Sequence, residues 1–137
     1  MYGALDISAS ALTAQRAHLD VIAANIANRD VTRGVDGGPY QRRVAVFAEG
    51  RSVGGQHKPG VHIERIVRDP APFDEVFDPS HPDAVQGGPR AGYVRKPNVD
   101  LSTEMVNAMM AARAYEANVA VMEITKSMAA ASLRLMA

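Results

Sequence analysis

The chain has 137 residues, a length that allows one compact domain and little more. Fifteen Lys and Arg residues balance fifteen Asp and Glu residues, so the formal net charge at neutral pH is zero. This balance argues against a protein that coats nucleic acid. Cysteine is absent, which excludes disulfide frameworks, cysteine-based metal sites and thiol nucleophiles.

Glycine and proline divide the chain into three parts. All eight prolines and ten of the eleven glycines lie between Arg29 and Pro97. Because these two residue types mark turns and interrupt helices, the sequence predicts a β-rich, turn-rich middle module over residues 31–98. The flanking segments, residues 1–30 and 99–137, are predicted to be long helices of a helical core.

A heptad pattern runs through the N-terminal segment. The row that recurs every seven residues consists of Leu5, Leu12, Leu19 and Ile26. This spacing predicts a helix of about 25 residues, ~40 Å long at 1.5 Å per residue. From periodicity alone, an ordinary amphipathic core helix explains the row equally well. Asn25 and Asn28 close the segment, where an asparagine either fixes the register of a helix pair or, for Asn28, is simply a C-terminal residue.

The middle module contains short extended segments. Residues 40–49 and 60–68 carry alternating or clustered β-branched and aromatic residues, which predicts two strands. Residues 91–94 are predicted to form a third. The glycine-rich stretch 50–60 is expected to be a hairpin tip or a flexible loop.

Two apolar stripes run along the C-terminal segment with alternating spacings of four and three. The first stripe consists of Leu101, Met105, Ala108, Ala112, Tyr115, Val119, Met122, Lys126, Ala129, Leu133 and Met136. The second stripe consists of Met110, Ala114, Ala117, Val121, Ile124, Met128, Ala131 and Leu135. At 100° per residue, the two stripes lie on nearly opposite faces of one helix. Charged residues such as Glu104 and Arg113 are expected at the edges between them.

A helix with two opposed apolar faces must be covered on both of them. With Asp100 or Ser102 as its N-cap, this helix could be ~55 Å long. A three-helix bundle would bury such a helix, but the sequence contains no third helix. We therefore expect burial against neighbouring copies or partner proteins.

No residue pattern points to catalysis. The four histidines have no metal-ligand spacing, and there is no phosphate-binding loop or nucleophile elbow. The only segment that could suggest an active site contains His81, within residues 78–83 (DPSHPD). Its two prolines favour a rigid turn instead. The basic pairs at 42–43 and 95–96 are expected at solvated strand edges. The sequence thus predicts no catalytic residue, no metal and no cofactor.

The N-terminus lacks the features of a secretory signal. The first positive residue is Arg16, and no apolar h-region follows. No run approaches the ~18–20 apolar residues that span a bilayer. We expect a soluble protein that stays in the cytoplasm or leaves by a route without a cleaved signal peptide.

Several motifs resemble those of flagellar axial proteins, the family of rod, hook and hook-associated proteins. The terminal blocks with this resemblance are residues 24–28 (ANIAN) with Thr32, 98–107 (NVDLSTEMVN) and 112–118 (ARAYEAN). Other motifs resemble the proximal rod proteins in particular: residues 6–15 (DISASALTAQ), 37–43 (GGPYQRR), 69–73 (DPAPF), 78–83 and 92–98 (GYVRKPN). The resemblance covers nearly the whole chain except residues 48–58.

The resemblance implies an α+β fold in which long N- and C-terminal helices pack as an antiparallel coiled-coil-like pair beside a small β-rich middle module. It implies a structural subunit of the proximal rod of the bacterial flagellar basal body, not an enzyme. Such subunits leave the cell through the flagellar type III export apparatus and assemble in the periplasmic space. Their terminal helices line a helical tube that transmits torque and forms the wall of the export channel.

The implied partners are other copies of the chain, other flagellar rod proteins and the export apparatus. No nucleic acid, small-molecule substrate or direct membrane insertion is expected. A different rod or hook protein and a cytoplasmic coiled-coil adaptor remain as alternatives. The residues expected at the assembly interface are Leu5, Leu12, Leu19, Asn25, Ile26, Asn28, Leu101, Met105, Tyr115, Asn118, Val119, Met122, Ile124 and Met128.

Overall fold

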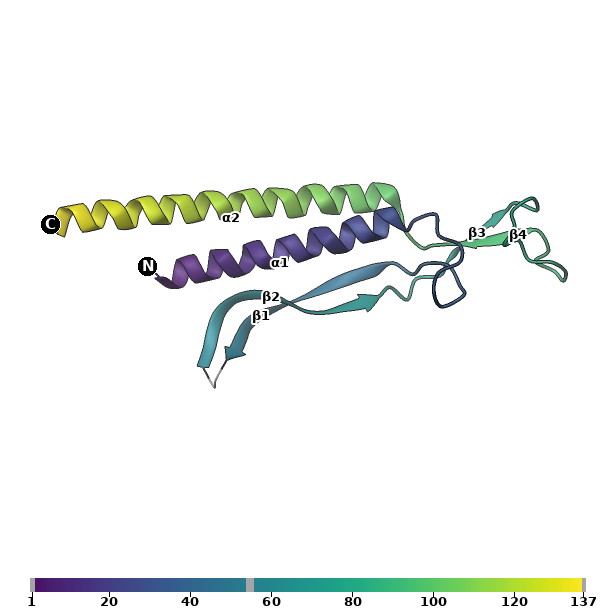
Figure 1. Cartoon of the computed structure of the whole chain (residues 1–137), viewed down its shortest axis with the longest axis horizontal. Helices are drawn as coiled ribbons and strands as arrows, with labels where there is room; N and C mark the ends of the chain where they lie inside the picture. Colours follow the sequence, from purple (N-terminus) through teal and green to yellow (C-terminus); the bar gives the residue numbers. More distant parts are fainter. Residues whose placement is uncertain (1, 54–55, 137) are drawn as a thin grey trace.

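The computed structural model describes residues 2–53 and 56–136. In chain order the elements are α1 (Tyr2–Ala27), β1 (Arg43–Val53), β2 (Gln56–Arg68), β3 (Asp74–Phe77), β4 (Tyr93–Lys96) and α2 (Leu101–Met136). The molecule is elongated, with both termini at one end and the β3–β4 hairpin at the other (Figure 1). The predicted α+β fold is confirmed.

The two long helices run antiparallel, as the family resemblance implied (Figure 1). α2 begins where the sequence predicted, because the Asp100 carboxylate accepts hydrogen bonds from the backbone N–H groups of Ser102 and Thr103. Asp100 is therefore the N-cap. The hydrogen bonds from Thr103 lower the pKa of Asp100, which keeps the capping carboxylate charged at the positive end of the helix dipole.

The middle of the chain forms two separate antiparallel hairpins. β1 pairs with β2, and register irregularities after Val46 and Glu49 bend the long hairpin. Strands form in both predicted stretches, 40–49 and 60–68, although β1 begins only at Arg43, and they extend into much of the 50–60 stretch that was expected to be a hairpin tip or a flexible loop. Residues 54–55, which fall within this predicted stretch, lie outside the described residues.

β3 pairs with β4 in the second hairpin. The sequence patterns did not predict β3. Its four residues from Asp74 to Phe77 are all exposed, so the strand has no buried face that an alternation of apolar and polar residues would mark. The strand predicted at 91–94 begins two residues later, at Tyr93. Gly92 precedes it with a φ of 84°, and a side chain there would meet the Phe77 ring. The turn conformation at Gly92 therefore sets where β4 begins.

α1 forms the middle layer of the helical half of the molecule. It packs against α2 on one side and against the β1–β2 hairpin on the other, whereas α2 packs against no strand of the described chain (Figure 1). This position explains why α1 contributes three of the buried apolar residues, Ala14, Val21 and Ile22, and α2 only Ala111.

Contacts along the middle of α1 anchor the β1–β2 hairpin to this helix. The His18 ring meets the Phe47 ring edge-on, with 5.2 Å between their centroids, and burial there lowers the pKa of His18 below its usual 6.5. Further along, the Ser10 hydroxyl accepts a hydrogen bond of 3.1 Å from the N–H of Val61. Gly60 makes this approach possible, because its φ is 136° and a Cβ there would clash with Ser10.

Replacing Gly60 with alanine is therefore expected to push the hairpin away from α1. Backbone strain and the clash with Ser10 should lower the free energy of unfolding by about 1–3 kcal/mol, measured by urea denaturation. Gly38→Ala is the matched control, because its Cβ would meet nothing within 4 Å and the change should be within about 1 kcal/mol of neutral. Equal stability of the two variants would contradict a close anchoring of the hairpin.

Candidate assembly interface

A buried polar cluster holds the ends of the elements together and thereby positions the helices. We call it the junction, and it consists of Asn25, Arg42, Asp69, Asn98 and Glu104. These residues come from the end of α1, the segment before β1, the residue after β2, the segment before α2 and the first turn of α2. The junction is the point at which chain segments far apart in sequence meet.

Asn25 uses its full hydrogen-bonding capacity inside the junction. Its amide nitrogen donates to the Glu104 carboxylate at 3.0 Å and to the carbonyl of Arg43 at 2.8 Å. Its amide oxygen accepts from the Tyr40 hydroxyl and the Arg43 N–H, both at 2.9 Å. Asn25 is only 1% exposed. A side-chain amide has two donors and one oxygen that accepts twice, so no side chain without an amide can make all four of these bonds.

Glu104 is fully buried, with 0% of its surface exposed. Its carboxylate is compensated by Arg42, whose guanidinium approaches to 2.7 Å. Arg42 also reaches Asp69 at 3.0 Å, so it bridges two carboxylates. Burial alone would lower the pKa of Arg42, but the hydrogen bonds to Glu104 and Asp69 raise it. Hydrogen bonds from the backbone of Ala71 and from Arg42 lower the pKa of Asp69.

Two expectations from the sequence are wrong here. Arg42 was expected at a solvated strand edge, but its side chain is only 21% exposed. Glu104 was expected at an exposed edge between the two stripes of α2. Glu104 is buried and Arg42 is half-buried, because each compensates the other's charge, in a pairing across 62 residues that local patterns do not reveal. Arg43, the other member of the basic pair, is exposed as expected.

Asn98 completes the junction on the side of α2. Its side-chain oxygen accepts a 2.8 Å hydrogen bond from the N–H of Arg42, and its nitrogen donates to the carbonyls of Asp69 and Ala71. Asn98 thus joins the chain before β1 to the chain after β2 immediately before α2 begins. The direction in which α2 leaves the junction is fixed by these bonds.

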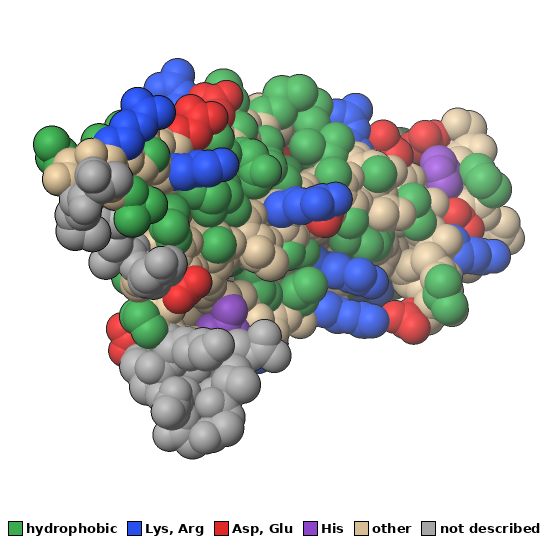
Figure 2. Space-filling model, turned by 60° about the vertical axis from the view of Figure 1, so that its left-hand side comes forward, with side chains coloured by type: hydrophobic (Ala, Val, Ile, Leu, Met, Phe, Trp, Pro, Cys, Tyr) green, Lys and Arg blue, Asp and Glu red, His purple; other side chains and the backbone are tan. Residues whose placement is uncertain are grey.

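The two apolar stripes of α2 have different environments. Along the first stripe, Ala108, Ala112, Val119 and Met122 are partly buried, on the side that α1 covers. Along the second, Met110, Val121, Ile124, Met128 and Leu135 are exposed by 66, 48, 58, 60 and 89%. In Figure 2, hydrophobic side chains gather over the helical half of the molecule, and charged side chains intermix at the β3–β4 end. We call the second stripe the bare face of α2.

The predicted interface residues separate into three groups in the structure. Those that are half-buried are Leu5, Leu12, Leu19, Ile26, Asn28, Leu101, Asn118, Val119 and Met122. Those that are exposed are Met105, Tyr115, Ile124 and Met128. Asn25 alone is buried, and it bonds only within the chain. Exposed apolar residues that the prediction omitted include Val106, Met109, Met110, Val121 and Leu135, although three of these, Met110, Val121 and Leu135, belong to the second stripe.

The helix asparagines bond to their own helices. Asn28 donates to the carbonyl of Ala24 at 2.7 Å, and Asn118 donates to the carbonyl of Ala114 at 2.7 Å. For Asn28 this geometry is that of a residue at the C-terminal end of a helix. Neither side chain bonds to the other helix within the described residues, so the helix register depends on Asn25.

The structure offers no catalytic arrangement around His81. Its Nδ1 accepts a hydrogen bond of 3.0 Å from the N–H of Asp83, and Ser80 bonds to Asp78, so the 78–83 segment is a tight turn. The Asp83 carboxylate accepts from the Thr32 hydroxyl at 2.7 Å, which ties this turn to the segment after α1. Over residues 2–53 and 56–136 we find no cluster of His, Asp and Glu that could hold a metal ion.

None of the described helices is both long enough and apolar enough to cross a membrane.

The Arg42–Glu104 pair gives a direct test of the junction. Arg42→Met would leave the Glu104 carboxylate buried without its cation, and we expect the free energy of unfolding to fall by about 3 kcal/mol in urea denaturation. Arg90→Met is the matched control, because Arg90 pairs with Glu75 at the surface and is 69% exposed. Loss of this surface ion pair should lower the free energy of unfolding by less than about 1 kcal/mol. A similar small loss in both variants would contradict the role of the junction.

Comparison with known proteins identifies the family. Residues 5–34 match the family described as flagella basal body rod protein, and residues 90–135 match the C-terminal family of flagellar basal body rod FlgEFG proteins. The first match ends within a few residues of Asn28, and the second contains Asn98, Glu104 and the bare face of α2.

Full-length relatives agree with these matches. The chain is 45% identical to the flagellar basal-body rod protein FlgC of Yersinia enterocolitica over 95% of this chain and 93% of that protein. It is 40% identical to FlgC of Bacillus subtilis over 98% and 97% of the two chains, and 37% identical to FlgC of Borreliella burgdorferi over 99% and 97%. At this identity and coverage, the chain belongs to the FlgC family of flagellar basal-body rod proteins.

Proposed function

We propose that this chain is a subunit of the proximal part of the flagellar rod that polymerises through its two terminal helices. The coarser part of this function follows from the family: the chain is a structural subunit of the basal-body rod and not an enzyme. The observation that carries the finer proposal is the bare face of α2, an apolar stripe along a 36-residue helix.

A contiguous apolar face of this length is unfavourable in water and marks a protein interaction site. The chain cannot cover it alone, because α1 already lies between α2 and the β1–β2 hairpin. A face covered by a different surface of the next subunit gives a heterologous contact, which continues as an open helix when it does not close into a ring. Such a helix is the architecture that a rod requires.

The proposal divides the chain by role. Residues 1–30 and 99–137 form the helical core that packs against neighbouring copies and other rod proteins and lines the export channel. Residues 31–98 form the middle module outside this core. The predicted interface residues that are exposed on α2, namely Met105, Tyr115, Ile124 and Met128, are assigned to contacts between subunits. The half-buried residues of both helices contribute mainly to the contact between α1 and α2.

Torque transmission requires that the helical core and the middle module turn together. The junction supports this part of the proposal, since Arg42 joins the two parts through ion pairs to the half-buried Asp69 and the buried Glu104. Thr32 and Asp83 add a second connection toward the β3–β4 hairpin. We include in the proposal the export of the chain through the flagellar type III apparatus and its assembly in the periplasmic space, which family membership supports.

Substitution of Ile124 separates assembly from folding. Ile124 is 58% exposed on the bare face, so Ile124→Glu should change the free energy of unfolding by less than about 0.5 kcal/mol. We expect this variant to be produced normally but to be absent from isolated basal bodies, with loss of swimming in soft agar. Ile124→Met, which keeps an apolar side chain, should swim normally. Normal basal bodies containing Ile124→Glu would contradict the proposed role of this face.

A further inference from the structure

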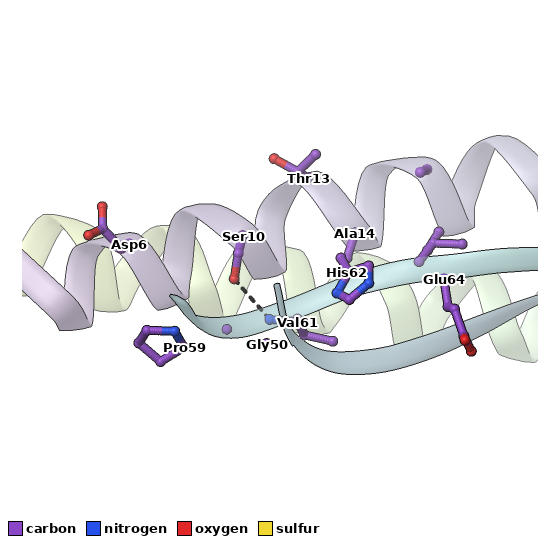
Figure 3. A pocket seen from close by; sticks show the side chains of 12 residues that line it. Asp6, Ser10, Thr13, Ala14, Gly50, Pro59, Val61, His62 and Glu64 are labelled. Carbon is purple, nitrogen blue, oxygen red and sulfur yellow. Dashed lines mark hydrogen bonds between the residues drawn. The ribbon is translucent and has the colours of Figure 1, made fainter. Parts of the chain in front are cut away.

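A groove lies between the N-terminal half of α1 and the β1–β2 hairpin. Its volume is about 820 Å³, and its lining extends along α1 from Asp6 to Ala17 and along the hairpin from Pro59 to Glu64, with Gly50 opposite. Figure 3 shows the helix forming one wall and the bent hairpin the other. The helix wall is made of small residues, including Ser10, Ala14 and Ala17. Small side chains allow a large apolar side chain to approach the backbone closely.

The walls of the groove are held in place by bonds within the chain. The hydrogen bond between Ser10 and Val61, drawn as a dashed line in Figure 3, joins the two walls. Gly60 brings the hairpin against Ser10, as described above. The groove is therefore formed before any partner arrives, which lowers the entropic cost of docking.

The polar residues of the groove favour a cationic occupant. Outside residues 51–58, whose side chains are not described, the lining contains the carboxylates of Asp6 and Glu64 and no Lys or Arg. Within the described residues neither carboxylate takes part in an ion pair. The buried Nδ1 of His62, another lining residue, has no hydrogen-bond partner in the described part of the chain.

The end of α2 extends past the start of α1. Asn25 bonds to Glu104, and the helices are antiparallel. Tyr2 precedes Asn25 by 23 residues, and the residue 23 positions after Glu104 is Ser127, so residues 128–136 have no part of α1 beside them. We call this segment the α2 overhang. Figure 1 shows α2 ending beyond the N-terminus of α1.

The overhang carries large apolar side chains and one positive charge, which suit a groove lined by small residues and carboxylates. Met128, Leu133 and Leu135 are exposed by 60, 65 and 89%, and Arg134 is its only charged side chain among the described residues. At 1.5 Å per residue its nine residues span about 13 Å, which fits within the ~17 Å of α1 that lines the groove. The overhang cannot enter the groove of its own chain, because α1 separates α2 from the hairpin.

We propose that the α2 overhang of one copy docks in the groove between α1 and the β1–β2 hairpin of a second copy. Large apolar side chains fill the space beside the small residues of α1, and Arg134 approaches Asp6 or Glu64 of the second copy. This inference rests on the proposed function, since it names one of the contacts through which copies polymerise. Because donor and acceptor surfaces differ, each copy can bind one neighbour on each side, and the contact continues along the assembly.

A photo-cross-linking residue at Thr13, an exposed lining residue, tests this contact in isolated basal bodies. We expect an irradiated product with twice the mass of the chain. After trypsin digestion, the peptide joined to position 13 should be residues 127–134 (SMAAASLR), which lie between Lys126 and the cleavage site after Arg134. The same cross-linker at Val35, which is fully exposed in the loop after α1, is the control and should not join this peptide.

The other outcomes overturn the inference. A product that joins position 13 to another protein, or to a different part of this chain, shows a different occupant of the groove. No product, either at Thr13 or with the cross-linker moved to Ala17, shows an empty groove. In both cases the chain is still present in basal bodies, so the proposed function stands. If the unmodified chain is absent from isolated basal bodies, the proposed function fails together with the inference.

Discussion

The buried contact between Asn25 and Glu104 fixes how the two helices lie against each other, and most other features depend on that register. A carboxylate with no exposed surface tolerates no sliding of one helix past the other, because a shift would separate it from both Asn25 and Arg42. The register in turn determines which stripe of α2 faces α1. It also determines how far α2 extends beyond α1, since α2 has 36 residues and α1 has 26.

The chain consequently has more apolar helix surface than it can bury. α1 is covered on two sides, by α2 and by the β1–β2 hairpin, whereas α2 is covered on one. In an enzyme this uncovered face would be a liability, but in a subunit that polymerises it is the binding surface. The polar junction and the apolar face therefore have separate tasks in the proposed function: the junction makes one rigid subunit from distant segments, and the face is proposed to join subunits to each other.

Local patterns predicted the elements of this fold well, because helical stripes, strand alternation and the Asp100 cap are visible over a few residues. They did not reveal β3, which is short and exposed, or the burial of Arg42 and Glu104, whose pairing exists only after the chain has folded. The family resemblance, however, pointed to the residues of the junction. The motifs that resemble rod proteins, residues 24–28, 37–43, 69–73 and 98–107, contain all five residues of the junction. The family resemblance thus marked the residues that meet in space, but not their contacts.

The central claim is that the bare face of α2 is solvent-exposed in the single chain and covered in the rod. Met110 and Met128 report on this face directly, and Met105 and Met109 are exposed residues of α2 outside it. Each of the four is more than half exposed, and methionine oxidises readily when accessible. Brief oxidation followed by peptide mass spectrometry should modify these four residues rapidly in the purified chain. In isolated basal bodies, the account predicts that Met110 and Met128, on the bare face, are protected several-fold. Equal oxidation of Met110 and Met128 in the two samples would contradict the account.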